Sequence, residues 1–135
     1  MTVSLVIVSH SVRLAEGVAE LAGQMAQGKV AIAAAGGTAE GALGTSVEKI
    51  LDALRRVDRP EGILVLLDLG SAVMATEMAV EAFAHDSPHA VTISSASLVE
   101  GAVIAAVEAS VGNSLEEVAE AAASAYTLPK VTTHN

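Results

Sequence analysis

The stretch V-S-L-V-I-V at residues 3–8 is short, almost wholly apolar and rich in β-branched side chains. Runs of this kind are typical of strands that are covered on both faces, as in parallel sheets. From Ser11 onward the apolar residues follow the period of one helix face instead, and they are Leu14, Val18, Leu21 and Met25. The chain is therefore expected to begin with a strand and a helix.

The same alternation of strand and helix continues through the chain. Further strands are predicted at residues 29–34, 62–67 and 90–94. The helical patterns that follow them have apolar positions at Val47, Ile50, Leu51 and Leu54, then at Ala75, Met78, Ala79 and Ala82, and then along residues 98–109. The Gly-rich residues 35–44 lie between the second strand and its helix and are expected to form a loop throughout.

A last helix is predicted over residues 115 to about 125, because Ser114 and Glu117 form a capping-box pattern just before and inside it. Residues 126–135 are expected to be a tail. The chain is thus predicted to contain one domain, residues 1–125, followed by that tail.

Four strand–helix units in 135 residues predict the α/β class. The expected architecture is a single doubly wound parallel sheet of about four strands, with helices on both faces and right-handed crossovers. A chain of this length with 52% apolar residues can build one core without disulfides or structural metal. In such folds ligands bind beyond the carboxyl ends of the strands, where the strand order reverses.

Composition and charge exclude several classes of function. Seven Lys and Arg against sixteen Asp and Glu give a net charge of −9, which argues against nucleic acid and anionic membranes as partners. The chain has no Cys, almost no aromatic residues and no dinucleotide-binding fingerprint, so neither a metal nor a cofactor is expected. No apolar run is long enough to span a membrane, and a soluble cytoplasmic protein is the expectation.

Polar side chains and glycines follow each predicted strand. They are Ser9, His10 and Ser11 after the first strand, Gly36, Gly37 and Thr38 after the second, Asp68, Gly70 and Ser71 after the third, and Ser95 and Ser97 after the fourth. Because the carboxyl ends of parallel strands share one edge of the sheet, these residues are expected to gather at that edge.

The chemistry these residues allow is phosphorylation of a histidine. His10 offers one ring nitrogen as a nucleophile, and Asp68 can accept a hydrogen bond from the N–H of the other nitrogen if the first and third strands are neighbours. Nε2, facing away from Asp68, is then the expected nucleophile. The predicted phosphate contacts flank two helix N-termini, which favour an anion, and they are Ser9, Ser11, Gly70 and Ser71.

Other interpretations of these residues stay open. A histidine after a strand is often only a loop or capping residue. Arg13 is a candidate contact for phosphate or a partner protein, or else a solvated surface residue. Gly37 and Thr38 either cradle phosphate or simply turn the chain. His85, His89 and His134 are expected to be bystanders, and with no Cys in the chain a metal site is not expected.

Three motifs resemble a known family. They are V-I-V-S-H-S-V-R-L-A-E-G at residues 6–17, L-D-L-G-S-A at residues 67–72 and S-L-V-E-G-A at residues 97–102. Together they resemble the phosphotransferase subunit of phosphoenolpyruvate-dependent dihydroxyacetone kinase (DhaM type), a mannose-family enzyme IIA-like domain. Mannose-type enzyme IIA domains themselves typically carry Gly-Gly-Ser-Pro after the matching Asp, whereas this chain has D-L-G-S-A, so the kinase subunit is preferred.

The resemblance implies a relay of phosphoryl groups with no cofactor in this chain. His10 would accept phosphate from phospho-HPr and pass it to ADP in the nucleotide-binding kinase subunit, and the ATP formed would phosphorylate dihydroxyacetone (glycerone) in a further subunit. Asp68 would support His10, with Gly70 and Ser71 beside the phosphate. Relatives form homodimers, for which the helix at residues 98–109 is a candidate surface. The alternatives are a mannose-type enzyme IIA of sugar transport and a non-catalytic interaction module.

Overall fold

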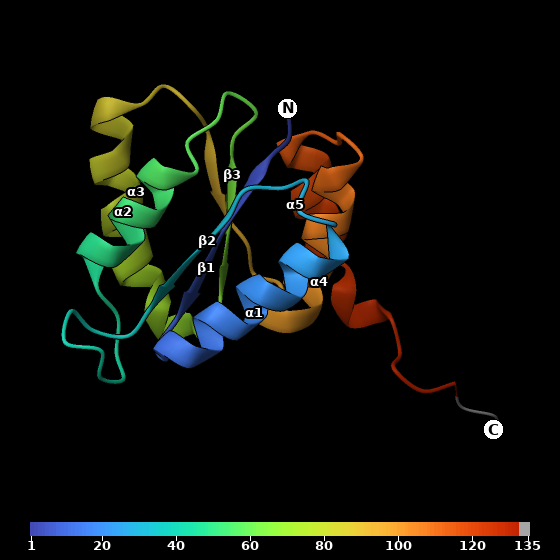
Figure 1. Ribbon diagram of the computed structural model, residues 1–135, viewed down its shortest axis with the longest axis horizontal. Coiled ribbons are helices and arrows are strands. Elements are labelled where there is room, and N and C mark those ends of the chain that lie inside the picture. Colours follow the sequence, from blue (N-terminus) through green and yellow to red (C-terminus); the bar gives the residue numbers. More distant parts are fainter. Residues whose placement is uncertain (133–135) are drawn as a thin grey trace.

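The computed structural model describes residues 1–132 of the chain (Figure 1). Strands and helices alternate along it, with two short 3₁₀ helices, η1 and η2. The elements are β1 (Ser4–Ser9), α1 (Val12–Met25), β2 (Ile32–Gly36), α2 (Val47–Arg56), β3 (Ile63–Leu67), η1 (Gly70–Ala72), α3 (Val73–Asp86), β4 (Val91–Ile93), α4 (Leu98–Ser110), α5 (Leu115–Ala123) and η2 (Ala125–Thr127).

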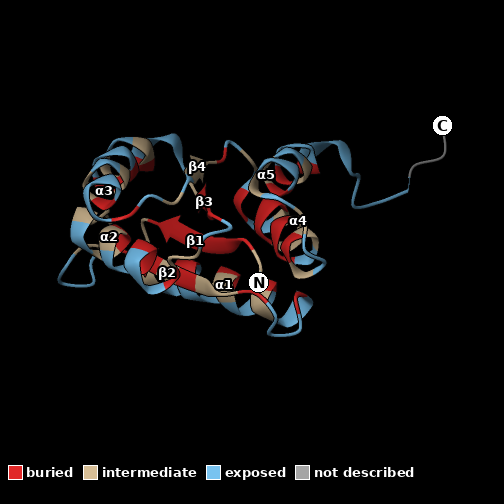
Figure 2. Ribbon diagram, turned by 90° about the horizontal axis from the view of Figure 1, so that it is seen from above, coloured by how far each residue is buried: buried red, intermediate tan, exposed pale blue. Residues whose placement is uncertain are grey.

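The four strands form one parallel sheet in the order β2-β1-β3-β4. The chain leaves β1 for β2 on one side and then crosses back to β3 on the other, so the strand order reverses between β1 and β3. Helices α1, α4 and α5 cover one face of the sheet, and α2 and α3 cover the other (Figures 1 and 2). The predicted α/β class and doubly wound parallel sheet are confirmed.

Strand β1 contributes to both cores because alternate side chains of a strand point to opposite faces. Val3, Leu5 and Ile7 pack with the helices α1, α4 and α5, and Val6 and Val8 pack with α2 and α3. All five side chains are buried, and β1, which begins just after Val3, is red in Figure 2. The apolar run that opens the chain is therefore the centre of the sheet.

The predicted inward face of α1 is wrong. Leu14, Leu21 and Met25 are 42%, 45% and 49% exposed, and of the expected stripe only Val18 is buried. The residues that face the sheet are instead Ala15, Val18, Ala22 and Ala26. Helix α1 lies close to the sheet and to α4, so small side chains fill the interface and the larger ones lie along the exposed flank. In α3 the expected inward residue Met78 is likewise 55% exposed, but here a large side chain, Phe83, fills the core.

Strand β2 begins and ends later than the sequence suggests. It includes Ala35 and Gly36, which were expected to belong to the loop. Gly36 is buried under the first turn of α1, where a Cβ atom would lie 2.5 Å from the carbonyl oxygen of Ser11 and 2.9 Å from Cβ of Ala15. The glycine is present because α1 passes so close to the strand end, and it does not mark a loop.

The C-terminal helices follow the prediction more closely. The expected capping box is formed, with the Ser114 N–H donating to Glu117 at 2.8 Å and the Glu117 N–H donating to the Ser114 hydroxyl at 3.2 Å. Helix α5 ends at Ala123, and the unpredicted η2 follows it. Within residues 1–132, no helix combines the length and the apolar character that a membrane span needs. His134 lies outside the described residues.

Candidate functional site

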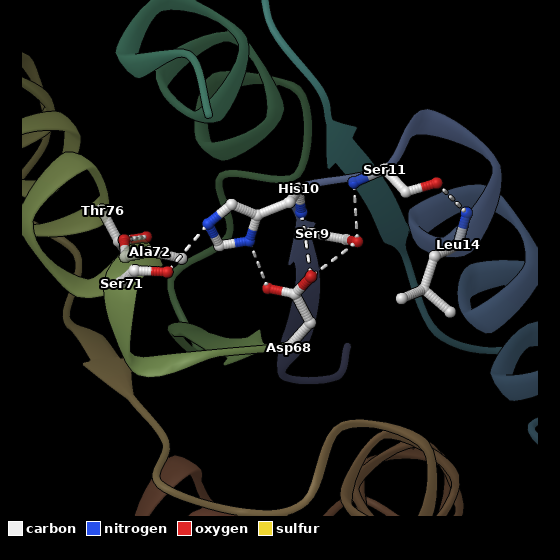
Figure 3. Close-up of polar contacts among 8 residues, drawn as sticks. All are labelled: Ser9, His10, Ser11, Leu14, Asp68, Ser71, Ala72 and Thr76. Atoms are coloured by element: carbon white, nitrogen blue, oxygen red, sulfur yellow. Dashed lines mark hydrogen bonds and ion pairs between the residues drawn. The ribbon is translucent and has the colours of Figure 1, made fainter. Parts of the chain in front are cut away.

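His10 and Asp68 meet at the edge of the sheet where the strand order reverses. His10 directly follows β1 and Asp68 directly follows β3, and the two strands pair in parallel with Val8 beside Leu67. The ring Nδ1 of His10 lies 2.9 Å from Oδ1 of Asp68 (Figure 3). The main-chain N–H of His10 donates to Oδ2 of the same carboxylate, also at 2.9 Å. Asp68 thus holds both the ring and the backbone of His10.

Hydrogen bonds keep the Asp68 carboxyl group ionised. Burial by itself raises its pKa, but the hydrogen bonds from the main chain and ring of His10 and from the Ser9 hydroxyl outweigh burial. The pKa of Asp68 therefore lies below its ordinary value. The group that faces His10 is a carboxylate, which only accepts hydrogen bonds.

The charge of Asp68 decides which nitrogen of His10 is reactive. Because the carboxylate only accepts, Nδ1 carries the single proton of the neutral ring and Nε2 then has the lone pair. The hydroxyl of Ser71 lies 2.9 Å from Nε2 and donates to it. Nε2 therefore points away from Asp68, towards the exposed residue Ser71, as Figure 3 shows.

The N-terminal ends of helices surround the His10 ring. Helix α1 begins two residues after His10, and its first turn is capped by the Ser11 hydroxyl, which accepts from the Leu14 N–H at 3.2 Å. The 3₁₀ helix η1, which contains Ser71, and α3, which continues it, have no side-chain cap. The positive end of such a helix favours an anion, so this side of the ring suits a phosphoryl group.

Two of the predicted phosphate contacts have other hydrogen-bond partners in the structure. The Ser9 hydroxyl is buried, donates to Oδ2 of Asp68 at 3.0 Å and accepts from the Ser11 N–H at 3.0 Å. Ser11 caps α1 with its own hydroxyl. Both serines therefore organise the backbone and the carboxylate around His10, while Gly70 and Ser71 lie exposed at the start of η1.

The remaining candidates lie further from the ring. Arg13 is exposed in the first turn of α1 and forms no ion pair with any residue of 1–132. The Thr38 hydroxyl accepts from the Ala42 N–H at 3.1 Å and so closes the Gly-rich loop on itself. Gly37 is buried with a φ of +73°, and a Cβ atom there would lie 2.8 Å from Val12, so only glycine fits.

Sequence reasoning missed how the Gly-rich loop holds His10. The Gly37 N–H donates to the Ser9 carbonyl at 3.1 Å, and the Gly44 N–H donates to the His10 carbonyl at 2.9 Å. Main-chain contacts of this kind have no residue signature, and only the position of the glycines after β2 pointed to the loop. Among residues 1–132, no three His, Asp or Glu side chains gather as a metal site would require.

Comparison with known proteins gives one family. Residues 4–119 match the EIIA-man family, described as the PTS system fructose IIA component. Two similar proteins are phosphoryl donor subunits, DhaM, of PEP-dependent dihydroxyacetone kinases. The Escherichia coli (strain K12) subunit is 41% identical over 86% of this chain and 25% of its own length. The subunit of kinase 2 from Listeria innocua serovar 6a is 38% identical over 86% of this chain and 93% of its own length.

A similar fold is found in a solved structure. The crystal structure of EF1359, a protein described as of unknown function, superposes with a TM-score of 0.75. It is 33% identical, and the match covers 91% of this chain and 94% of that one. The chain thus spans nearly all of some relatives and about a quarter of the Escherichia coli relative.

Proposed function

Since the chain belongs to the EIIA-man family and, within it, to the DhaM phosphoryl donor subunits, we propose that it carries a phosphoryl group on Nε2 of His10. The observation that carries this proposal is the position of the His10 ring. Its Nδ1–H is held by an ionised Asp68, and its Nε2 faces Ser71 at an uncapped helix end. The carboxylate supports the positive charge that the ring acquires when Nε2 forms a bond to phosphorus.

The proposed donor is HPr, carrying phosphate on a histidine of its own. The lone pair of Nε2 forms a bond to phosphorus while the bond between phosphorus and the donor nitrogen breaks, and the donor nitrogen keeps that electron pair. Nδ1 keeps its proton throughout, so the phosphorylated ring is cationic beside Asp68. The Ser71 hydroxyl leaves Nε2 and donates to a phosphoryl oxygen instead.

The proposed acceptor is ADP bound in a nucleotide-binding kinase subunit. An oxygen of its terminal phosphate attacks phosphorus, the bond to Nε2 breaks, and Nε2 regains its lone pair. The ATP that forms then phosphorylates dihydroxyacetone in a further subunit. This assignment, a subunit of phosphoenolpyruvate–glycerone phosphotransferase, is supported by the names of the relatives and by the D-L-G-S-A turn after β3.

The proposal extends to the setting of the domain. Residues 1–125 are proposed to be the phosphoacceptor domain, residues 126–135 a tail, and the cytoplasm the compartment shared with HPr. A homodimer is proposed through α4. The inward side of that helix is buried in the chain's own core, so the side available to a second copy contains Val99, Val103 and Val107.

Phosphate mapping followed by a chase tests the proposed function. The protein is incubated with phosphoenolpyruvate, enzyme I and HPr, and the modified residue is located by mass spectrometry under basic conditions. Phosphate on His10 is expected, and phosphate elsewhere would refute the assignment. The labelled protein is then mixed with an ADP-loaded kinase subunit or with a sugar-transport IIB domain. Transfer to the kinase subunit is expected, and transfer to IIB alone would favour a sugar-transport role.

A further inference from the structure

Lys49 lies outside the site described so far and has an unusual partner. It is in the first turn of α2, half-buried, and its ammonium donates to the carbonyl oxygen of Gly36 at 2.9 Å. The cleft around it also contains the acidic residues Glu16 and Asp52. No carboxylate in the described part of the chain lies within ion-pair distance of this ammonium. The cation therefore binds a peptide group at the end of β2.

That peptide group is the first of two that lead to the functional site. The carbonyl of Gly36 and the N–H of Gly37 belong to the same peptide, and this N–H donates to the carbonyl of Ser9 at 3.1 Å. The Ser9 carbonyl in turn shares a peptide with the N–H of His10, which donates to Oδ2 of Asp68 at 2.9 Å. Three hydrogen bonds and two peptides thus join the ammonium to the carboxylate.

All donors in this chain of hydrogen bonds point the same way. The C=O and N–H of a trans peptide are antiparallel, so a hydrogen bond accepted at one end strengthens the donor at the other. A cation at the start and an anion at the end polarise every link in the same direction. The strengthening is about 10–30% per bond in condensed phases. Lys49 therefore acts at a distance on the carboxylate that holds the His10 ring.

We infer that Lys49 is a positioning residue for phosphoryl transfer: its ammonium anchors and polarises the two peptides that end on the Asp68 carboxylate. The inference rests on the proposed function of His10 for its role in transfer, whereas the chain of hydrogen bonds itself is independent of that function. Lys49 touches neither the phosphoryl group nor the His10 ring and acts only through the backbone.

The two glycines beside the first peptide support this inference. Gly36 has no room for a Cβ atom beneath α1, and Gly37 has a left-handed φ of +73° and no room beside Val12. The peptide between them is therefore held in one orientation, with its carbonyl towards Lys49 and its N–H towards Ser9. Any other residue pair would move this peptide out of the chain of hydrogen bonds.

A purely structural role for Lys49 makes different predictions. Strand β2 is at the edge of the sheet, and a charged side chain bound to its end, like that of Lys49 from α2, would protect the free edge from other chains. Loss of such a role would lower stability or solubility and would leave the ionisation of Asp68 unchanged. Measurements on Asp68 and on the His10 amide therefore separate the two roles.

The test compares Lys49→Met, Lys49→Arg and the control Lys29→Met, which removes an equal charge at an exposed position. Carbon-detected NMR titration follows the Asp68 carboxyl group, and the proton shift of the His10 amide reports its hydrogen bond. Single-turnover transfer from phospho-HPr gives the rate. Lys49→Met is expected to raise the pKa of Asp68, move the His10 amide upfield and slow transfer roughly two- to fourfold. Lys49→Arg is expected to keep the Asp68 pKa, the His10 amide shift and the transfer rate near their wild-type values. Lys29→Met is expected to change none of them.

Two results would overturn the inference. In one, Lys49→Met leaves the Asp68 titration and the His10 amide unchanged, whatever its effect on stability. In the other, Lys29→Met shifts Asp68 as much as Lys49→Met does, so that net charge alone explains the effect. A wild-type protein that takes no phosphate on His10 refutes the proposed function instead, and the two NMR measurements still decide whether the polarised peptides exist.

Discussion

Two of the histidines that the structure describes bind an aspartate through Nδ1, and they lie at opposite ends of the strands of the sheet. His10 meets Asp68 at 2.9 Å beyond the carboxyl ends of the strands, and His89 meets Asp58 at 2.7 Å at the other end. The two rings are similarly accessible, with 25% and 30% of the side-chain surface exposed. Neither the pairing nor the exposure distinguishes them.

The first pair lies beside N-terminal ends of helices, and the second lies beside C-terminal ends. His10 lies beside the N-terminal ends of α1 and η1, whereas Asp58 follows the C-terminal end of α2 and His89 follows that of α3. A helix C-terminus favours a cation and opposes a phosphoryl group, which is a dianion. The Ser87 hydroxyl also donates to Asp58 and not to the ring. We therefore expect that a histidine–aspartate pair alone does not make a phosphoacceptor, and that the helix ends around the pair decide whether it can accept a phosphoryl group.

Removing each histidine ring should give the largest difference in phosphate uptake between the two pairs. His10→Ala is expected to reduce phosphate uptake from phosphoenolpyruvate, enzyme I and HPr to background, because it removes the proposed nucleophile. His89→Ala is expected to take up as much acid-labile, base-stable phosphate as the wild type. Radiolabelled uptake under single-turnover conditions measures both, and label retained in His10→Ala would show that the helix ends do not select the ring.

Replacing each carboxylate by its amide is the second-largest change. Asp68→Asn is expected to slow transfer about 10- to 100-fold, the range seen when the hydrogen-bonding partner of a metal-bound histidine is lost. Its amide no longer carries the charge that supports a phosphorylated ring. Asp58→Asn should leave transfer unchanged and lower the free energy of unfolding by about 1 kcal/mol. Rapid-quench kinetics and urea unfolding give the two quantities, and equal transfer rates in both variants would contradict a role for Asp68.

Removing the hydroxyl beside each pair is a smaller change. Ser71→Ala is expected to slow transfer by about fivefold, the equivalent of one hydrogen bond of roughly 1 kcal/mol to the phosphoryl group. Ser87→Ala, at the second pair, should transfer phosphate at the wild-type rate. The same rapid-quench assay compares them. Faster transfer by Ser71→Ala would mean that the hydroxyl competes for Nε2 more than it helps the phosphoryl group.

The smallest expected effect is the pH dependence of stability. The pKa of Asp68 is lowered in the folded state from its ordinary value of 3.8, so its ionisation stabilises the fold above that value. This contribution is lost as the pH falls below 3.8 towards the lower pKa of the folded protein. Urea unfolding of wild type and Asp68→Asn should therefore differ more at pH 7 than at pH 3. A difference that grows on acidification would have the wrong sign.

Much of this arrangement could be predicted from the sequence, because it follows from the topology. Once four strand–helix units imply a parallel sheet, His10 and Asp68 must lie at the same edge, and a reversal between the first and third strands brings them together. The apolar character of β1 and the capping box of α5 are equally local signals. Residues that depend only on their neighbours in sequence were predicted well.

The errors concern contacts between distant elements. Hydrophobicity alone marked Leu14, Leu21 and Met25 as the inward face of α1, but the short distance from α1 to the sheet admits only small side chains there. The positions of Ser9 and Lys49 were equally unpredictable. Ser9 binds the carboxylate that follows β3, and Lys49 binds the carbonyl at the end of β2. No residue pattern in the sequence predicts either contact.

The hydrogen bond from Ser71 also covers the nitrogen of His10 that is proposed to carry phosphate. The lone pair that is proposed to attack phosphorus accepts this hydrogen bond while no donor is present, so an alkylating agent or a metal ion has to displace the hydroxyl before it reaches Nε2. Unmasking requires only that one hydroxyl turn away, at a cost of about 1 kcal/mol, and no part of the backbone has to move. We therefore expect Nε2 of the free protein to react more slowly with such reagents than an unpaired imidazole nitrogen would.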